Sequence, residues 1–273
     1  MIQPPTPHIP LPDGWGAGSF TFNTNLQTVL PIFSLGKDRS FNFLGSGFVI
    51  GSGGRSAIVV SAAYVFRQAQ HLHGAPPKHH ATALPFFLKQ DDVVRLKGAT
   101  LATFFPTDEP AAYAATINEV QVSHITDLAL FSVTLDAHVP AHVQFTRSFS
   151  IDTTPPTVGT EVHCAGYGDV AVGETHSHGD DGSGNWFRQT LMLRDATILE
   201  TYAEYTPMKL GQSFRVSAPI SSGMSGGPVL KRIVNGQTSV IGVNTLDLAT
   251  VDAEASGEKA IAQALWPLVV KAQ

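Results

Sequence analysis

Ser225 is the residue of this sequence best suited to act as a nucleophile. It lies in the stretch SSGMSGGPVL between Gly223 and Gly226, and an apolar, strand-like run begins at Pro228. Glycines allow backbone turns that other residues resist, so amides near the serine can point at an incoming carbonyl oxygen. Such a serine would carry out acyl transfer. For an isolated Ser-Gly-Gly, an ordinary turn between strands is the favoured interpretation, so the rest of the sequence must distinguish the two.

The same residues also fit the G-x-S-x-G pattern, in which the serine lies on a turn between a strand and a helix. That arrangement needs a helix directly after the serine, and an acidic residue and a histidine later in the chain. Here a strand-like run follows, and the last histidine of the sequence is His178, which precedes the serine. The order of residues therefore excludes an α/β-hydrolase.

Short runs rich in β-branched and aromatic residues recur along the chain between Gly, Pro, Asn and Asp. Examples are GSGFVIG, AIVVSAA, LALFSVTL, TLMLRDATILETY and TSVIGVNTL. Each run is typical of a strand. A Pro- and Thr-rich stretch near 140–158 separates two such halves, so the pattern predicts an all-β protein in two parts. Apolar residues at helical spacing predict a helix within 253–273.

Four motifs in order resemble those of trypsin-like serine peptidases of the chymotrypsin fold, with the bacterial HtrA-like protease domain as the most similar branch. They are GSGFVI at 45–50, SAAY at 61–64, DLAL at 127–130 and GMSGGP at 223–228. Four ordered motifs are far more specific than one. The resemblance covers the protease domain only, without a PDZ domain.

The resemblance implies two six-stranded Greek-key β-barrels. The expected boundaries are an N-terminal extension over 1–20, an N-terminal barrel over 21–145, a C-terminal barrel over 146–252 and a C-terminal helix over 253–273.

The resemblance also implies catalytic roles at the matching positions. Ser225 matches the nucleophile, and Asp127 matches the buried carboxylate that orients the base. The amides of Gly223 and Ser225 match the oxyanion hole. Tyr64 occupies the position of the catalytic histidine.

Three further residues match positions that bind substrate in this family. Asn244 and Thr245 lie in VIGVNT, which resembles the substrate-binding strand, and Pro219 matches the base of the primary specificity pocket. Because proline offers no carboxylate to Lys or Arg, the resemblance implies a small or aliphatic side chain in that pocket. Met224 stands where trypsin-type zymogens have an Asp that pairs with a new N-terminus, so activation by N-terminal cleavage is not expected.

A tyrosine is a poor substitute for the histidine. The base must take the serine proton and return it to the leaving amine, which works best when its pKa is near the operating pH. A phenol with a pKa of about 10 is ionised to roughly one part in a thousand at pH 7, and a nearby carboxylate raises that pKa further. Losing the histidine of a comparable site costs on the order of a millionfold in turnover. We therefore expect a site that binds peptide and barely cleaves it.

Other histidines would have to fold towards Ser225 to replace the missing base. A solvated polar loop is the favoured interpretation of the histidines in the stretch after Tyr64: His71, His73, His79 and His80. His124, three residues before Asp127, would point from the other side of a strand or of its preceding turn and is disfavoured as well. The stretch HSHGDD groups residues that can bind a transition metal, but its glycines favour a flexible solvated loop: His176, His178, Asp180 and Asp181. Neither a metal nor a cofactor is expected.

Composition narrows the class of protein further. A chain of 273 residues with 43% hydrophobic residues can form a sizeable core, and its net charge of −5 without a basic run disfavours nucleic acid as a partner. Cys164 is the single cysteine, which excludes an internal disulfide, and its apolar neighbours favour a buried thiol. No apolar run is long enough to span a membrane, and no secretory signal pattern opens the chain. We expect a cytoplasmic protein with no membrane partner, unless a signal has been removed.

Three functions remain open. The first is a peptidase homologue, or pseudoprotease, that holds an extended peptide or protein in the cleft between its barrels with severely reduced cleavage. The second is an active serine endopeptidase, in which Tyr64 was substituted for histidine or a neighbouring histidine acts. The third is a non-catalytic interaction module, since a fold does not fix a function. The sequence does not predict an oligomeric state.

Overall fold

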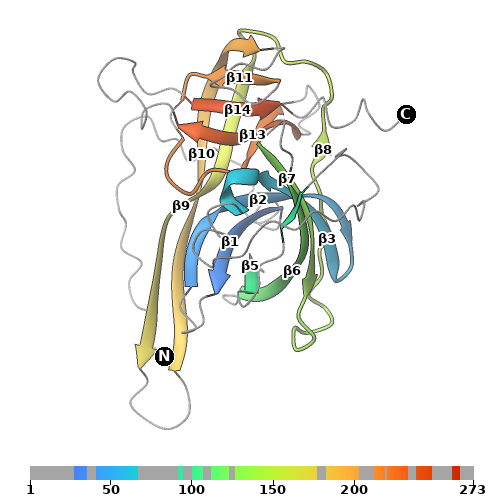
Figure 1. Ribbon diagram of the computed structural model, residues 1–273, viewed down its shortest axis with the longest axis vertical. Helices are drawn as coiled ribbons and strands as arrows, with labels where there is room; N and C mark the ends of the chain where they lie inside the picture. Colours follow the sequence, from blue (N-terminus) through green and yellow to red (C-terminus); the bar gives the residue numbers. More distant parts are fainter. Residues whose placement is uncertain are drawn as a thin grey trace.

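Two β-sheets make up the part of the chain that the computed structural model describes (Figure 1). The described residues are 28–35, 41–66, 92–94, 100–106, 112–122, 127–176, 183–202, 212–218, 220–232, 238–247 and 260–264. The strands of the first sheet are β1 (Val29–Leu35), β2 (Phe41–Gly53), β3 (Ser56–Ala62), β4 (Asp92–Val94), β5 (Thr100–Pro106), β6 (Ala112–Val122) and β7 (Leu128–Leu135). Those of the second are β8 (Ser150–Ile151), β9 (Glu161–His176), β10 (Ser183–Tyr202), β11 (Ser213–Val216), β12 (Pro228–Arg232), β13 (Thr238–Asp247) and β14 (Ala260–Ala264).

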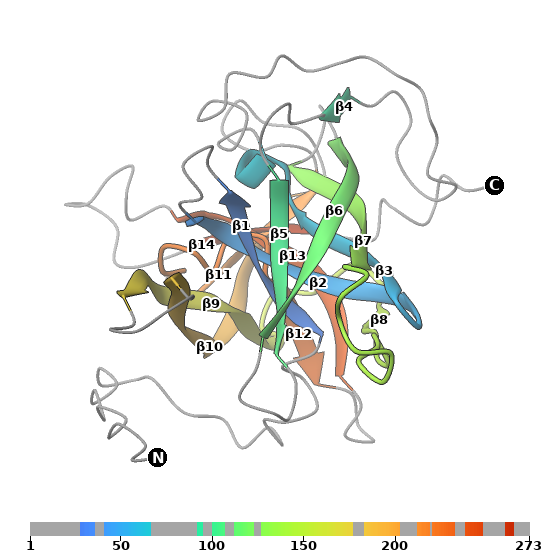
Figure 2. The same cartoon turned by 90° about the horizontal axis from the view of Figure 1, so that it is seen from below.

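Each sheet closes into a barrel of six strands. In the first sheet the order is β4-β6-β5-β1-β2-β3-β7, and β7 also pairs with β6, so six strands form a ring and the short β4 joins β6. In the second the order is β12-β9-β10-β11-β14-β13-β8, and β12 also pairs with β13. The short β8 joins that ring through a parallel pairing with β13. Figure 2 shows the first barrel in front of strands of the second.

The two rings have the same Greek-key connectivity. Three consecutive strands form a meander, β1-β2-β3 in one ring and β9-β10-β11 in the other. Counted along the chain, the sixth strand of each ring pairs with the third (β7 with β3, β14 with β11), and the fourth pairs with the first (β5 with β1, β12 with β9). This arrangement confirms the predicted all-β fold of two six-stranded, chymotrypsin-like barrels. All pairings within each ring are antiparallel, and closure of the ring leaves no open sheet edge between its members.

The predicted C-terminal helix is wrong for Ala260–Ala264, which form β14. This strand pairs with β11 through Ser213↔Gln263 and with β13 through Gly242↔Ala264, and so closes the second barrel. Without it, β11 and β13 would each present an unpaired edge, and pairing on both sides outweighs a local helical pattern. The second barrel therefore extends beyond the predicted boundary at 252, and the remainder of 253–273 lies outside the described residues.

Strands β9 and β10 form a long hairpin on either side of the stretch HSHGDD, where glycines favour a flexible loop. These strands are paired from Thr197↔Glu161 to Ser183↔His176, and the hairpin extends well beyond the second barrel (Figure 1). His178, Asp180 and Asp181 lie outside the described residues, and only the backbone of His176 is described. Within the described part of the chain, no helix has the length and apolar character needed to cross a membrane.

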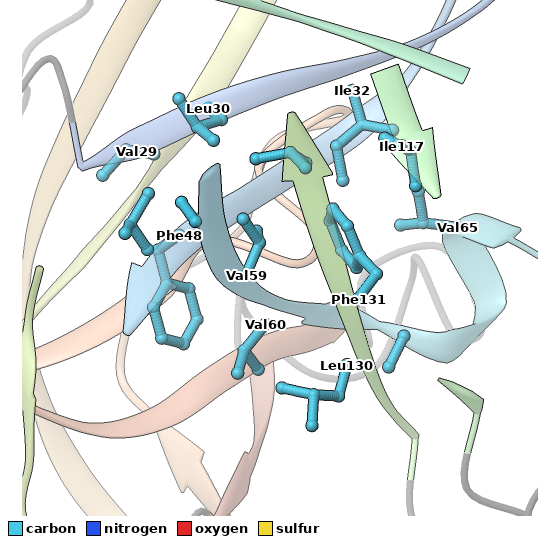
Figure 3. Close-up of a cluster of buried hydrophobic side chains, with 14 of the residues drawn as sticks. Val29, Leu30, Ile32, Phe48, Val59, Val60, Val65, Ile117, Leu130 and Phe131 are labelled. Carbon is cyan, nitrogen blue, oxygen red and sulfur yellow. The ribbon is translucent and has the colours of Figure 1, made fainter. Parts of the chain in front are cut away.

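The hydrophobic core of the first barrel includes side chains from the second barrel. Figure 3 shows part of it, with side chains from β1, β2, β3, β6 and β7 and from the turn after β3: Val29, Leu30, Ile32, Phe48, Val59, Val60, Val65, Ile117, Leu130 and Phe131. The same cluster includes Tyr167 of β9 and Leu230 of β12 from the second barrel. The hydroxyl of Tyr167 donates to the carbonyl of Val29 at 3.2 Å. Apolar packing and this bond therefore fix one barrel against the other.

Candidate active site

Glycine is required on both sides of Ser225 in the loop before β12, residues 220–227, which we call the nucleophile loop. Gly223 and Gly226 have φ angles of 90° and 84°, a left-handed conformation that side chains disfavour. A Cβ on Gly226 would lie 2.0 Å from the carbonyl oxygen of Ser46, and one on Gly223 would lie 2.3 Å from Cε1 of Phe43. Close contact with the first barrel thus explains the Gly-x-Ser-Gly pattern.

Backbone hydrogen bonds hold the nucleophile loop in a compact turn. The amide of Met224 donates to the carbonyl of Ser221 at 3.0 Å, and the amide of Gly227 donates to that of Met224 at 2.9 Å. Met224 is fully buried, as its place in the second core requires. In the described parts of the chain, the amides of Gly223 and Ser225 donate to no other protein group, so both remain available to an oxygen of a ligand.

Asp127 is fixed by the backbone of a single helical turn, residues 63–66, that follows β3. Asp127 precedes β7, which pairs with β3 through Ala62↔Leu128, so the carboxylate is delivered beside the turn. The amide of Tyr64 donates to Oδ1 of Asp127 at 3.0 Å, and the amide of Ala63 donates to its carbonyl at 3.0 Å. Asp127 is only 7% exposed. The bond to this carboxylate comes from the main chain of residue 64, so it does not require a particular side chain there.

The phenol of Tyr64 lies close enough to the hydroxyl of Ser225 for that hydroxyl to influence its pKa. Burial raises the pKa of Tyr64 above its ordinary value of 10.0; the hydroxyl of Ser225 opposes this shift, and the charge of Asp127 adds to it. The phenol consequently keeps its proton at neutral pH and has no capacity to take the proton of the serine. The turn that carries it is packed by Phe66, whose ring centroid lies 5.0 Å from that of Phe131.

Asn244 holds the nucleophile loop from behind. Its side chain is fully buried and donates to the carbonyls of Ala165 at 2.8 Å and Met224 at 3.4 Å. The main-chain amide of Asn244 donates to the carbonyl of Gly227 at 2.9 Å, and the main-chain carbonyl of Asn244 accepts from the amide of Gly226 at 2.7 Å. These contacts give Asn244 a positioning role and leave its side chain no exposed surface for a substrate.

The remaining predicted residues differ in how far the structure describes them. Thr245 lies beside Asn244 on β13 and is 8% exposed. Pro219 lies outside the described residues, and so do the histidines considered as replacement bases: His71, His73, His79, His80 and His124.

Two buried polar residues of the site were not predicted. Ser46 of β2 is fully buried, and its hydroxyl donates to the carbonyl of Gly223 at 2.8 Å. Arg194 of β10 is 8% exposed, and its Nη2 donates to Oγ of Ser221 at 2.8 Å. Ser46 lies inside the motif GSGFVI. Arg194 alternates with Met192 and Ala196 on the inward face of its strand, and this alternation is the signal that would have marked it as buried.

Cys164 takes no part in the site. It is fully buried in the core of the second barrel, and burial raises the pKa of its thiol to about 12. The prediction of a buried structural thiol is confirmed. Among the residues that the structure describes, no group of three or more His, Cys, Asp or Glu side chains is placed to hold a metal ion.

Two Greek-key barrels that bring a serine, a buried carboxylate and two available amides to their junction define a chymotrypsin-like serine peptidase scaffold. The chain belongs to the trypsin-like peptidase domain family, whose family model matches residues 45–243.

Two solved structures are similar to the chain at low sequence identity. The chain is similar to Deg5, with 16% identity over 82% of each chain and a TM-score of 0.48. It is also similar to AL20, a thermostable serine protease from an extremophilic microorganism, with 14% identity over 88% of this chain and 92% of that one and a TM-score of 0.48. A comparison with curated proteins gives no match.

Proposed function

We propose that this protein binds an extended peptide or protein segment at the junction of its barrels and cleaves it only at a severely reduced rate. The observation that carries the proposal is the contact of Tyr64 with Ser225, at the position where the family has its histidine. A protonated phenol beside the serine cannot activate it, while the loop amides can hold a carbonyl oxygen.

The site supports binding and cleavage to different degrees. Hydrolysis needs a group that accepts the serine proton and then passes it to the leaving amine. Tyr64 cannot serve as that group, because its raised pKa keeps the phenol protonated. The main-chain amide of Tyr64 donates to the carboxylate of Asp127, and Asn244 and Ser46 hold the nucleophile loop; none of these contacts needs a histidine. Loss of the base therefore leaves the rest of the site assembled.

Binding and cleavage of fluorescein-labelled casein, a largely extended protein, test the two halves of the proposal. We expect the protein to bind casein and to release almost no fluorescent fragments. The exposed Ser222 belongs to the nucleophile loop, so Ser222→Trp should block binding, whereas Ser52→Trp, at an exposed serine of β2, should not.

Binding that survives Ser222→Trp would place the interaction elsewhere and favour a non-catalytic module. Rapid cleavage would favour an active endopeptidase whose base is another residue. Absence of binding in all three proteins would contradict recognition of extended segments.

A further inference from the structure

Ser46 connects the first barrel to both ends of the oxyanion region. It lies on β2 and is fully buried. Its amide donates to the carbonyl of Ser225 at 2.8 Å, and its hydroxyl donates to the carbonyl of Gly223 at 2.8 Å. One residue of the first barrel thus holds the main chain of the nucleophile loop at two points, one on each side of Met224.

The hydroxyl of Ser46 is itself held in one orientation. It accepts a hydrogen bond from the amide of Tyr167 at 2.8 Å, and the carbonyl of Ser46 accepts one from the hydroxyl of Ser61 at 2.6 Å. A serine hydroxyl has a single proton, and an acceptor position filled by an amide fixes where that proton points. The proton of Ser46 is therefore directed at Gly223.

The bond to Gly223 controls the orientation of a peptide plane. The carbonyl of Gly223 and the amide of Met224 belong to the same planar unit, so they turn together. Ser46 holds the carbonyl, while the amide of Met224 donates to Ser221 at 3.0 Å. Glycine at φ 90° has the freedom to adopt other backbone conformations, so this plane needs external contacts to stay in one orientation.

We propose that Ser46 is a positioning residue for the oxyanion hole, because its hydroxyl fixes the peptide between Gly223 and Met224, which joins the two peptides that carry the amides of Gly223 and Ser225, and so keeps both amides facing a substrate carbonyl. This inference rests on the proposed function in so far as that function assigns the two amides to the oxyanion hole. The local effect of Ser46 on the loop does not depend on catalysis and can be measured without it.

The first measurement is hydrogen exchange of the loop amides in the protein with its native Tyr64. Ser46→Ala removes the bond to Gly223. Ser61→Ala is the matched control, because it removes an equally buried hydroxyl from the same network and leaves that bond in place. We expect the amide of Met224 to exchange about tenfold faster in Ser46→Ala than in Ser61→Ala, because local opening becomes more frequent when the plane is free to turn.

The second measurement is phosphonylation by a fluorophosphonate in a Tyr64→His background, well below the melting temperature of every variant. The oxygen of Ser225 forms a bond to phosphorus, the phosphorus–fluorine bond breaks, fluoride leaves, and the serine proton passes to the histidine. Adding Ser46→Ala should slow bond formation about 10- to 100-fold without weakening initial probe binding, since oxyanion contacts act on the transition state. Adding Ser61→Ala should leave the rate close to that of Tyr64→His alone.

Exchange and phosphonylation that are the same in Ser46→Ala and Ser61→Ala would overturn the role of Ser46. If Tyr64→His itself is not phosphonylated, the proposed role of position 64 fails, and the exchange of Met224 alone decides the role of Ser46. If Ser46→Ala does not fold, Ser46→Cys replaces it in both measurements, because a thiol of similar size is a much weaker donor. Parent-like values in that variant would then contradict the proposal.

Discussion

Replacing Tyr64 with histidine should convert the site into a functioning peptidase. The phenol keeps its proton because its pKa is raised above 10.0, so less than about one part in a thousand is ionised at pH 7. An imidazole with a pKa near 6.5 is about three-quarters neutral at the same pH. Asp127 is already held by the amide of residue 64 at 3.0 Å, so the carboxylate that would orient the imidazole needs no rearrangement.

The expected gain follows from the cost of losing the base. Removing the histidine of a comparable triad lowers turnover by on the order of 10⁶, and removing the aspartate by about 10⁴. We expect Tyr64→His to raise kcat/KM by about 10⁴- to 10⁶-fold, equivalent to about 5–8 kcal/mol of transition-state stabilisation.

Hydrolysis of fluorescein-labelled casein, followed against pH, measures this gain. The activity of Tyr64→His should fall below pH about 6.5 as the imidazole becomes protonated. Ser225→Ala in the same background should return the rate to that of the native protein. A folded Tyr64→His protein that is no more active than the native chain would refute the reasoning, because it would show that the tyrosine is not the defect.

Three further predictions concern stability. Gly226→Ala should lower the free energy of unfolding by at least about 2 kcal/mol in urea titrations, because a Cβ there would lie 2.0 Å from the carbonyl of Ser46. Gly54→Ala, with φ 60° and open space around it, should cost only about 1 kcal/mol, and equal losses would contradict the clash. Phe66→Ala should cost about 3–5 kcal/mol, whereas Val158→Ala at a site 62% exposed should change stability by less than about 0.5 kcal/mol. Stability should also fall above pH about 8.5, the pKa of an unfolded thiol, because burial raises the pKa of Cys164 to about 12 and the unfolded chain loses its proton first. The slope for this group is at most about 1.4 kcal/mol per pH unit, and Cys164→Ala should remove it; an unchanged pH profile in that variant would contradict the assignment.

The sequence predicts the fold well because barrel strands carry their own local signals. AIVVSAA and LALFSVTL alone predict the strands β3 and β7, and the pairing of these two strands places Asp127 beside the turn of Tyr64. The error at Ala260–Ala264 has a physical cause. The local pattern of these five residues favours a helix, but their strand pairing with β11 on one side and β13 on the other outweighs it.

The candidate site is only partly visible in the sequence. Motifs locate Ser225, Asp127 and Gly223 because each belongs to a short run with a recognisable pattern. The contact of Ser46 with Gly223 joins residues 177 positions apart, and no local pattern reports it. For Asn244 the motif indicates substrate binding, whereas in the structure its buried side chain holds the nucleophile loop through a hydrogen bond to Met224.

Labelling of the native protein by a fluorophosphonate tests directly whether Ser225 lacks activation when Tyr64 replaces the histidine. Intact-mass spectrometry after incubation at neutral pH measures the fraction of protein that carries the probe on Ser225, with Ser225→Ala as the blank. Because the phenol of Tyr64 stays protonated against the serine, we predict almost no labelling over a period in which Tyr64→His is fully labelled. Rapid, stoichiometric labelling of Ser225 in the native protein would show that the serine is activated and would contradict the account.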